Sequence, residues 1–184
     1  MLRATEMAQL LLRQRLKEGD VVVDATVGNG HDTLFLADQV GPTGQVIGFD
    51  VQKAALEHTT ARLGERLHVR LVHAGHETLA AHLDGETVRL AAAMFNLGYL
   101  PGTDKTVMTG SETTLAAVQQ ILALLSVGGL MTIVLYPGHA GGGEEARNVL
   151  AFAQNLEDDF AVSRYQRINS RKPAPDLLVV ERRR

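Results

Sequence analysis

The sequence predicts an α/β fold in which a mostly parallel sheet lies between two layers of helices. Apolar runs of strand length alternate with segments of helical period along most of the chain, a pattern typical of a parallel sheet covered by helices. The last two β-rich runs have no helix between them, so we expect an antiparallel hairpin at one sheet edge. A length of 184 residues suits one such domain, and we expect residues 1–184 to form it.

The first half of the chain is expected to hold three strands and the helices that connect them. An N-terminal helix should run to about Glu18, and a Gly-Pro-Thr-Gly turn at residues 41–44 should precede the second strand. The remaining elements expected in this half are the strands Val21–Asp24, Gln45–Asp50 and Leu67–His73 and the helices His31–Gln39, Gln52–Leu63 and Glu77–His82.

The second half should complete the parallel sheet and add the hairpin. Thr109 and Glu112 have the spacing of a capping box, which predicts a helix from there to about Ser126. Gly128 and Gly129 are expected to end this helix. The other elements expected are the strands Val88–Phe95 and Leu130–Tyr136, the helix Glu144–Leu156 after three glycines, and the hairpin strands Phe160–Ile168 and Asp176–Glu181.

Composition narrows the kinds of protein that the chain could be. The absence of cysteine excludes disulfides, thiolate nucleophiles and cysteine-type zinc sites, and we expect no metal site. No apolar run is long enough for a membrane span, and Arg13 and Arg15 interrupt the N-terminal apolar stretch, so neither a membrane anchor nor a signal peptide is expected. We therefore expect a cytoplasmic protein. Its net charge of -3 gives no global positive field for non-specific nucleic-acid binding.

The segment after the first predicted strand favours a nucleotide-type ligand. Gly28 and Gly30 allow a tight turn and a close approach of the backbone, and the next helix presents its N–H groups there. Asp50, at the end of the second strand, could accept hydrogen bonds from both ribose hydroxyls of an adenosine. The alternative for the glycine loop is a simple tight connection. After the third strand, His76 is expected either to contact the adenine or to cap a helix.

The segment after the fourth strand is the most informative for chemistry. Asn96-Leu-Gly-Tyr99 resembles the Asn-Pro-Pro-Tyr motif of methyltransferases that act on exocyclic or side-chain nitrogens. In-line methyl transfer requires that an amine be held with its lone pair toward the methyl carbon. The carbonyl oxygen of Asn96 could accept the amine hydrogens, and the ring of Tyr99 could stack on a planar base. The alternative is a turn with a core tyrosine.

Three motifs in order resemble one family over nearly the whole chain. They are Asp24-Ala-Thr-x-Gly-Asn-Gly-His-Asp-Thr, Phe95-Asn-Leu-Gly-Tyr-Leu-Pro-Gly with Asp104-Lys105, and Tyr136-Pro-Gly-His139 with Gly143-Glu-Glu. They are similar to the small bacterial class I methyltransferases labelled putative rRNA methylases. Class I methyltransferases share a Rossmann-like three-layer α/β/α sandwich with a seven-stranded sheet, whose five parallel strands are followed by an antiparallel pair.

The resemblance implies a cofactor, an acceptor and a partner. The cofactor would be S-adenosyl-L-methionine, and the reaction N-methylation of 5-aminomethyl-2-thiouridine at the wobble position of tRNA. Asp24 would lie near the cationic part of the cofactor, with a helix cap as its alternative role. The full set expected at the cofactor is Asp24, Thr26, Gly28, Asn29, Gly30, Asp32, Thr33, Asp50, Gln52, Gly75, His76, Glu77 and Asn96.

The acceptor side is expected to include catalytic groups and RNA contacts. An aminomethyl group is mostly protonated at neutral pH, so a base is needed, and His139 and Asp104 are the candidates beside Asn96 and Tyr99. A late basic cluster, including Arg164 and Arg167, should contact phosphates in the anticodon region of the tRNA. The acceptor side is expected to comprise Leu97, Gly98, Tyr99, Pro101, Gly102, Lys105, Tyr136, Arg171 and Lys172.

Several alternatives stay open at the level of sequence. An rRNA or a small molecule could replace tRNA as the acceptor. Gly28, Gly30 and Asp50 would also suit an NAD-dependent oxidoreductase. However, none of the three tyrosines has a lysine four residues after it, so the Tyr-x-x-x-Lys pair is absent. A non-catalytic RNA-binding module could retain the same fold. The sequence does not determine the oligomeric state, and a homodimer is one alternative.

Overall fold

The computed structural model describes residues 1–83, 88–98, 109–138 and 141–184. The strands are β1 (Val21–Asp24), β2 (Gln45–Asp50), β3 (Val69–His73), β4 (Leu90–Asn96), β5 (Leu125–Leu135), β6 (Phe160–Tyr165) and β7 (Asp176–Arg182). The helices are α1 (Ala4–Arg13), α2 (His31–Val40), α3 (Lys53–Leu63), α4 (Ser111–Leu124), α5 (Gly142–Gln154) and the 3-10 helix η1 (His76–His82).

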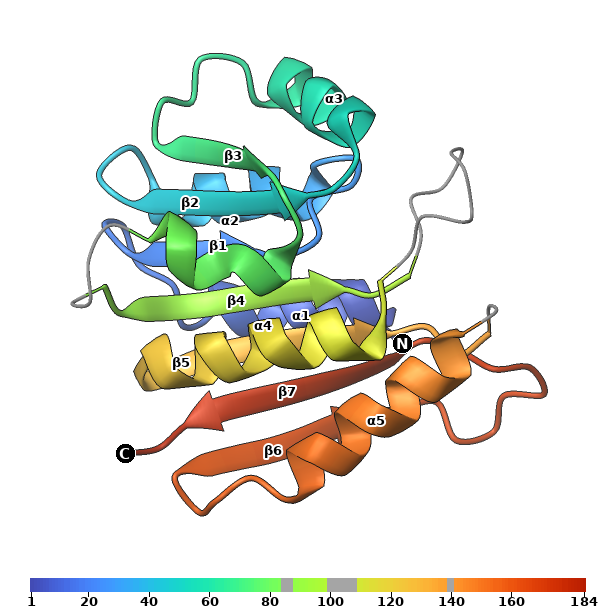
Figure 1. Cartoon of the computed structure of the whole chain (residues 1–184). Coiled ribbons are helices and arrows are strands. Elements are labelled where there is room, and N and C mark those ends of the chain that lie inside the picture. Colours follow the sequence, from blue (N-terminus) through green and yellow to red (C-terminus); the bar gives the residue numbers. More distant parts are fainter. Residues whose placement is uncertain (84–87, 99–108, 139–140) are drawn as a thin grey trace.

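All of these strands belong to one sheet, in the order β3-β2-β1-β4-β5-β7-β6. The pairs β3–β2, β2–β1, β1–β4 and β4–β5 are parallel, whereas β7 is antiparallel to both β5 and β6. Figure 1 shows α4 and α5 in front of this sheet and α1 and α2 behind it. The predicted three-layer α/β fold with a C-terminal antiparallel hairpin is therefore confirmed.

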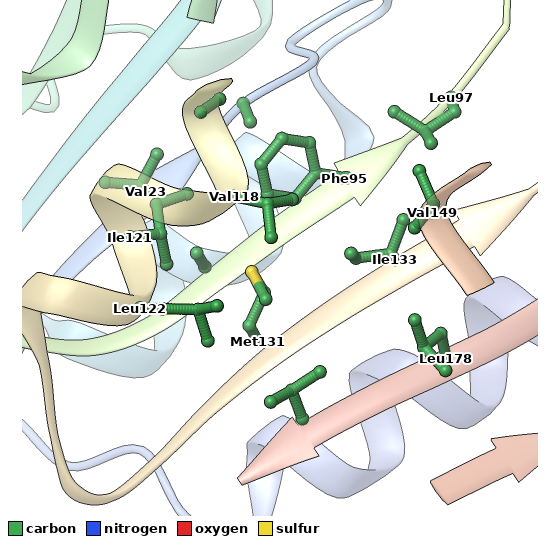
Figure 2. Packing of buried hydrophobic residues seen from close by; sticks show 14 of the residues in the cluster. Val23, Phe95, Leu97, Val118, Ile121, Leu122, Met131, Ile133, Val149 and Leu178 are labelled. Atoms are coloured by element: carbon green, nitrogen blue, oxygen red, sulfur yellow. The ribbon is translucent and has the colours of Figure 1, made fainter. Parts of the chain in front are cut away.

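Side-chain alternation along the strands gives the sheet two apolar faces. On β4, Ala93 and Phe95 belong to one buried cluster, whereas Ala92 and Met94 belong to the other. The first cluster is covered by η1, α4 and α5. Figure 2 shows Val118 of α4 among the side chains that pack with Phe95. Burying one large apolar side chain of this kind stabilises the fold by roughly 1.5–3 kcal/mol. Phe95 and Leu97 both belong to this cluster and flank the polar Asn96 at the end of β4.

The second apolar face is covered by α1 and α2. Ala4, Ala8 and Leu12 lie one turn apart on α1 and are buried in a cluster that includes Met94 of β4 and Leu177 of β7. This stripe attaches the N-terminal helix to the centre of the sheet. The N-terminal end of α1 consequently lies near the edge at which β7 begins (Figure 1).

The predicted helix Glu144–Leu156 lies two residues earlier, at Gly142–Gln154. Two further predictions about helix ends are wrong. The N-terminal helix ends at Arg13 instead of about Glu18, because its buried stripe stops at Leu12 and the chain then turns, with the Asp20 carboxylate accepting from the N–H of Lys17 at 2.7 Å. The capping box at Thr109 is also wrong. Gly110 is the N-cap of α4 and no side chain caps it, because the Thr109 hydroxyl bonds elsewhere.

Strand β5 begins at Leu125, earlier than the predicted Leu130. Gly128 and Gly129 do not end the helix but lie within the strand. Gly128 has a φ of +81°, a conformation that favours glycine, and the pairing with β4 is irregular at this end of the strand. Glycines that form such an irregularity are hard to distinguish by sequence from glycines that end a helix. β6, in turn, ends at Tyr165 instead of Ile168.

None of the helices in the described part of the chain is long and apolar enough to cross a membrane.

Candidate active site

A cleft of about 990 Å³ lies at the carboxyl ends of the parallel strands. Its walls come from the segments after β1, β2, β3, β4 and β5, and from α1 and the segment before β7. Ligands of open α/β sheets bind at this edge, near the switch in strand order. Here the switch lies at β1, whose two neighbours are β2 and β4. The volume is at the upper end of the range of small-molecule and cofactor sites.

Asp50 at the end of β2 holds the glycine loop in place. One of its carboxylate oxygens accepts from the N–H of Gly28 at 2.8 Å, and the other accepts from the N–H of Gln52 at 2.8 Å. An ionised carboxylate has about four acceptor positions. Asp50 lines the cleft and therefore retains acceptor capacity for hydroxyl groups of a ligand.

Asp24 lies beneath the cleft wall and is 1% exposed. Its carboxylate accepts from the hydroxyl of Thr33 at 2.6 Å and from the N–H of Thr26 at 3.1 Å. Burial, with the nearby charge of Asp32 as the second cause, raises the pKa of Asp24 to about 7. Asp24 is not a helix cap, because the N-cap of α2 is Gly30. The result is a poorly solvated acidic centre directly behind the loop.

Asp32 connects three elements at the cleft. It accepts from Gln9 Nε2 of α1 at 2.6 Å through one oxygen and from Asn96 Nδ2 of β4 through the other. Burial raises the pKa of Asp32, and these two hydrogen bonds oppose that rise. The N–H of Asn96 donates to the Thr26 hydroxyl at 2.7 Å. Asn96 Oδ1 is buried and has no partner among the described residues.

His76 is neither a helix cap nor exposed to solvent. Its Nδ1 lies 2.9 Å from the carbonyl oxygen of Ala25, and its ring meets that of Phe95 edge-on at 5.5 Å. Because a carbonyl only accepts, Nδ1 carries the proton, and the remaining Nε2 is an acceptor. Burial lowers the pKa of His76, which keeps the ring neutral. Within the part of the chain that the structure describes, Nε2 has no partner.

Glu145 of α5 fixes the two ends of the segment that follows β4. It is 3% exposed and accepts from the hydroxyls of Thr109 and Thr114, each at 2.8 Å. The Thr109 hydroxyl also accepts from the N–H of Gly98 at 2.9 Å, and the Thr109 N–H donates to the Gly98 carbonyl at 3.0 Å. Gly98 and Thr109 are therefore tied together and to α5.

Most of the predicted site residues that can be placed meet at this cleft. Those that line it are Thr26, Gly28, Asn29, Asp32, Asp50, Gln52, Gly75, His76, Glu77, Asn96, Leu97, Gly98 and Tyr136. Asp24, Gly30 and Thr33 do not line it. A Cβ on Gly30, where φ is +74°, would lie 2.5 Å from the hydroxyl of Thr59, so helix packing alone requires a glycine there.

The other predicted residues either do not line the cleft or fall outside the described part of the chain. Tyr99, Pro101, Gly102, Asp104, Lys105 and His139 are outside the described residues. Arg171 and Lys172 are exposed and do not line the cleft, although Pro173 does. The guanidinium of Arg164, which was expected to contact RNA phosphates, instead pairs with the buried carboxylate of Asp176. This ion pair joins β6 to β7.

The structure adds cleft residues that the sequence did not indicate. Arg3, Thr5, Glu6 and Gln9 bring the N-terminal segment and α1 into the wall, and Pro173 and Pro175 add the segment before β7. The amphipathic pattern of α1 in the sequence predicts that one face of the helix is buried. It does not predict which end of the sheet the helix reaches.

Comparison with known proteins identifies the family of the chain. The family model described as "Putative rRNA methylase" matches residues 46–181, and a model described as "Methyltransferase domain" matches residues 16–70. The chain belongs to this rRNA methylase family. It is accordingly a methyltransferase with the class I fold, and the oxidoreductase and non-catalytic alternatives are not supported.

Individual relatives extend over the whole chain. The chloroplastic tRNA (mnm(5)s(2)U34)-methyltransferase of Arabidopsis thaliana is 38% identical over 98% of this chain and 70% of its own length. The crystal structure of a putative rRNA-methylase from Clostridium thermocellum has a TM-score of 0.94 at 38% identity, covering 99% of this chain and 98% of that one. A Streptococcus mutans protein described as a putative methyltransferase, solved in complex with SAH, has a TM-score of 0.88 at 36% identity, covering 99% of both chains.

Proposed function

We propose that this rRNA methylase family member uses S-adenosyl-L-methionine to N-methylate the aminomethyl group of 5-aminomethyl-2-thiouridine at the tRNA wobble position. The observation that carries the proposal is the amide of Asn96. Its Nδ2 donates a hydrogen bond to Asp32, and its Oδ1 is a buried acceptor without a partner in the described residues. A buried carbonyl oxygen of this kind favours a ligand that brings an N–H.

The described residues fit the cofactor. When bound, S-adenosyl-L-methionine supplies an activated methyl group on a sulfonium sulfur. Asp50 retains acceptor positions suited to ribose hydroxyls, and the neutral Nε2 of His76 suits an amino group such as that of adenine. Burial raises the pKa values of both Asp24 and Asp32, because a negative charge is poorly solvated at these positions. A cationic ligand would stabilise the ionised form of both carboxylates.

The residues of the chain would prepare the amine by orientation. Asn96 Oδ1 would accept one amine hydrogen and so direct the nitrogen lone pair away from the amide. The aminomethyl group carries an extra proton at neutral pH, which must leave to a base before the nitrogen can attack. Asp104 and His139 are the candidates for this base.

The choice of tRNA is supported by the named activity of the Arabidopsis relative, which matches nearly the whole chain. The product in that name, mnm(5)s(2)U34, is what N-methylation of the aminomethyl nucleoside would give. The alternative acceptor is the rRNA in the description of the family.

Nucleoside mass spectrometry would test the proposal in cells and in vitro. Cells that lack the protein should accumulate 5-aminomethyl-2-thiouridine in tRNA, and purified protein with the cofactor should convert it to the methylated form. Asn96→Ala should abolish conversion while affinity for S-adenosylhomocysteine stays within a few fold. A methylated rRNA nucleoside that disappears with the protein, with tRNA unchanged, would reject tRNA as the substrate.

A further inference from the structure

A second hollow of about 420 Å³ adjoins the cleft on the side of the N-terminus. Arg3, Thr5, Tyr136 and Pro175 line both spaces, so the two lie side by side. The hollow extends beyond the cleft along residues 1–5 and past the end of β6 to Arg167. A ligand that leaves the cleft on this side would therefore enter the hollow.

Its walls combine aromatic rings with positive charge. Two of the three tyrosines of the chain, Tyr136 and Tyr165, lie in the walls. Arg3 and Arg167 lie there as well, and no carboxylate is among the lining residues that the structure describes. Aromatic rings stack on bases, and arginine pairs with phosphate. The combination fits a nucleotide better than an uncharged metabolite.

Both arginines are available to a phosphate. Arg167 is exposed, and no described carboxylate pairs with it. Arg3 pairs with Glu6 at 2.7 Å, one turn along the helix, but its side chain is 81% exposed. Exposed pairs of this kind contribute little to stability, so exchanging Glu6 for a phosphate would cost little.

A hydrogen bond joins two walls of the hollow. The hydroxyl of Tyr165, at the end of β6, donates to the carbonyl oxygen of Leu2 at 2.8 Å. This hydrogen bond joins residues that are 163 positions apart in the chain and holds the two walls together. A preformed site avoids part of the ordering cost of binding.

We propose that this hollow holds the nucleotide adjacent to the acceptor nucleotide in the RNA strand, with Arg167 on the connecting phosphate. The inference rests on the proposed function, because it assumes that the acceptor in the cleft is part of an RNA chain. It assigns a role in substrate binding to the N-terminal segment and to the end of β6.

The test compares substrates of increasing length. The kcat/KM of wild-type protein would be measured on the free aminomethyl nucleoside and on the same nucleoside extended by one nucleotide on its 5′ or its 3′ side. At least one extension should raise kcat/KM by roughly tenfold, the effect of one charge-assisted contact. Arg167→Ala should remove most of this gain. Arg183 is exposed and follows the C-terminal end of β7, whereas the hollow adjoins the start of that strand. Arg183→Ala should therefore leave the gain intact.

A binding experiment without chemistry separates the two proposals. Fluorescence anisotropy of a labelled, unmodified uridine trinucleotide should show weaker binding to Arg167→Ala, and the slope of log K against log salt should fall by about 0.7 for the lost phosphate contact. If Arg167→Ala shows this weaker binding but no aminomethyl nucleoside is methylated, the nucleotide-binding role of the hollow is supported and the proposed function is rejected. If methylation occurs while Arg167→Ala and Arg183→Ala behave alike in both assays, the hollow is not a nucleotide site.

Discussion

Asn96 Nδ2 donates to a carboxylate oxygen of Asp32, and Oδ1 of the same amide has no partner in the described chain. A carboxylate can only accept, so Asp32 determines which amide atom is left for another partner. Gln9 holds the second carboxylate oxygen at 2.6 Å, which fixes Asp32 from α1. Asp32 is therefore a positioning residue for Asn96, in addition to its predicted place at the cofactor.

Asp32→Asn should lower kcat by about tenfold. An amide at this position can donate as well as accept, so the side-chain amide of Asn96 could flip and exchange the positions of its Oδ1 and Nδ2. Affinity for S-adenosylhomocysteine, measured by calorimetry, should change less than kcat. Asp38→Asn is the matched control, since Asp38 is on the same helix and its one ion pair among the described residues is an exposed pair with Arg66. An equal loss of kcat and of cofactor affinity would show that Asp32 acts on the cofactor alone.

Asp24→Asn should stabilise the unliganded protein at pH 8. The folded state raises the pKa of Asp24 from an ordinary value of 3.8 to about 7, so between about pH 4 and pH 7 the folded state binds a proton that the unfolded chain releases. This contribution to stability is lost as pH rises from about 4 to about 7. The variant has no such charge, so its Tm at pH 8 should be higher by about 3 °C or more.

The comparison requires Tm of both proteins from pH 5 to 8, because other groups also titrate. The difference in Tm between Asp24→Asn and wild type should increase with pH and level off above 7. The variant should also gain less stability from S-adenosylmethionine, since it lacks the negative charge behind the loop that would attract the cation. A Tm difference that does not depend on pH would place the pKa of Asp24 near its ordinary value.

His76 provides a test of how the adenine is recognised. Its neutral Nε2 is an acceptor, which suits the adenine amino group but would repel the carbonyl of hypoxanthine. Wild-type protein should bind S-adenosylhomocysteine at least about tenfold more tightly than its inosine analogue, because a mismatched polar group is left unpaired. His76→Phe should bind the two ligands with similar affinities. Equal affinities in the wild type would remove His76 from adenine recognition.

The fold was predictable because its signals are local and repeated. The bounds of β1 and β2 were correct, and the absence of a helix between the last two strands indicated the hairpin. Errors occurred where a residue had two plausible local roles. Gly128 could end a helix or bend a strand, and Thr109 could cap α4 or, as observed, bond to Glu145.

The site was predictable at the ends of strands but not where distant segments meet. Residues at the carboxyl edge of a parallel sheet converge by topology, which is why Asp50 and Asn96 were found. Gln9 precedes β1, and nothing in its helix indicates that it reaches Asp32. The burial of Asp24 was likewise invisible, since the same carboxylate could face a ligand or lie behind the loop.

Thr109→Val should weaken acceptor binding while leaving the cofactor site intact. The substitution keeps the shape of the side chain but removes the hydroxyl that donates to Glu145 and accepts from the N–H of Gly98. It leaves buried polar groups without partners, so the free energy of unfolding should fall by about 2 kcal/mol. KM for the acceptor should rise more than threefold, because Gly98 is then held only through its carbonyl. Thr60→Val, which removes an exposed hydroxyl bonded within α3, is the matched control. An unchanged KM despite the loss of stability would limit this cluster to a role in folding.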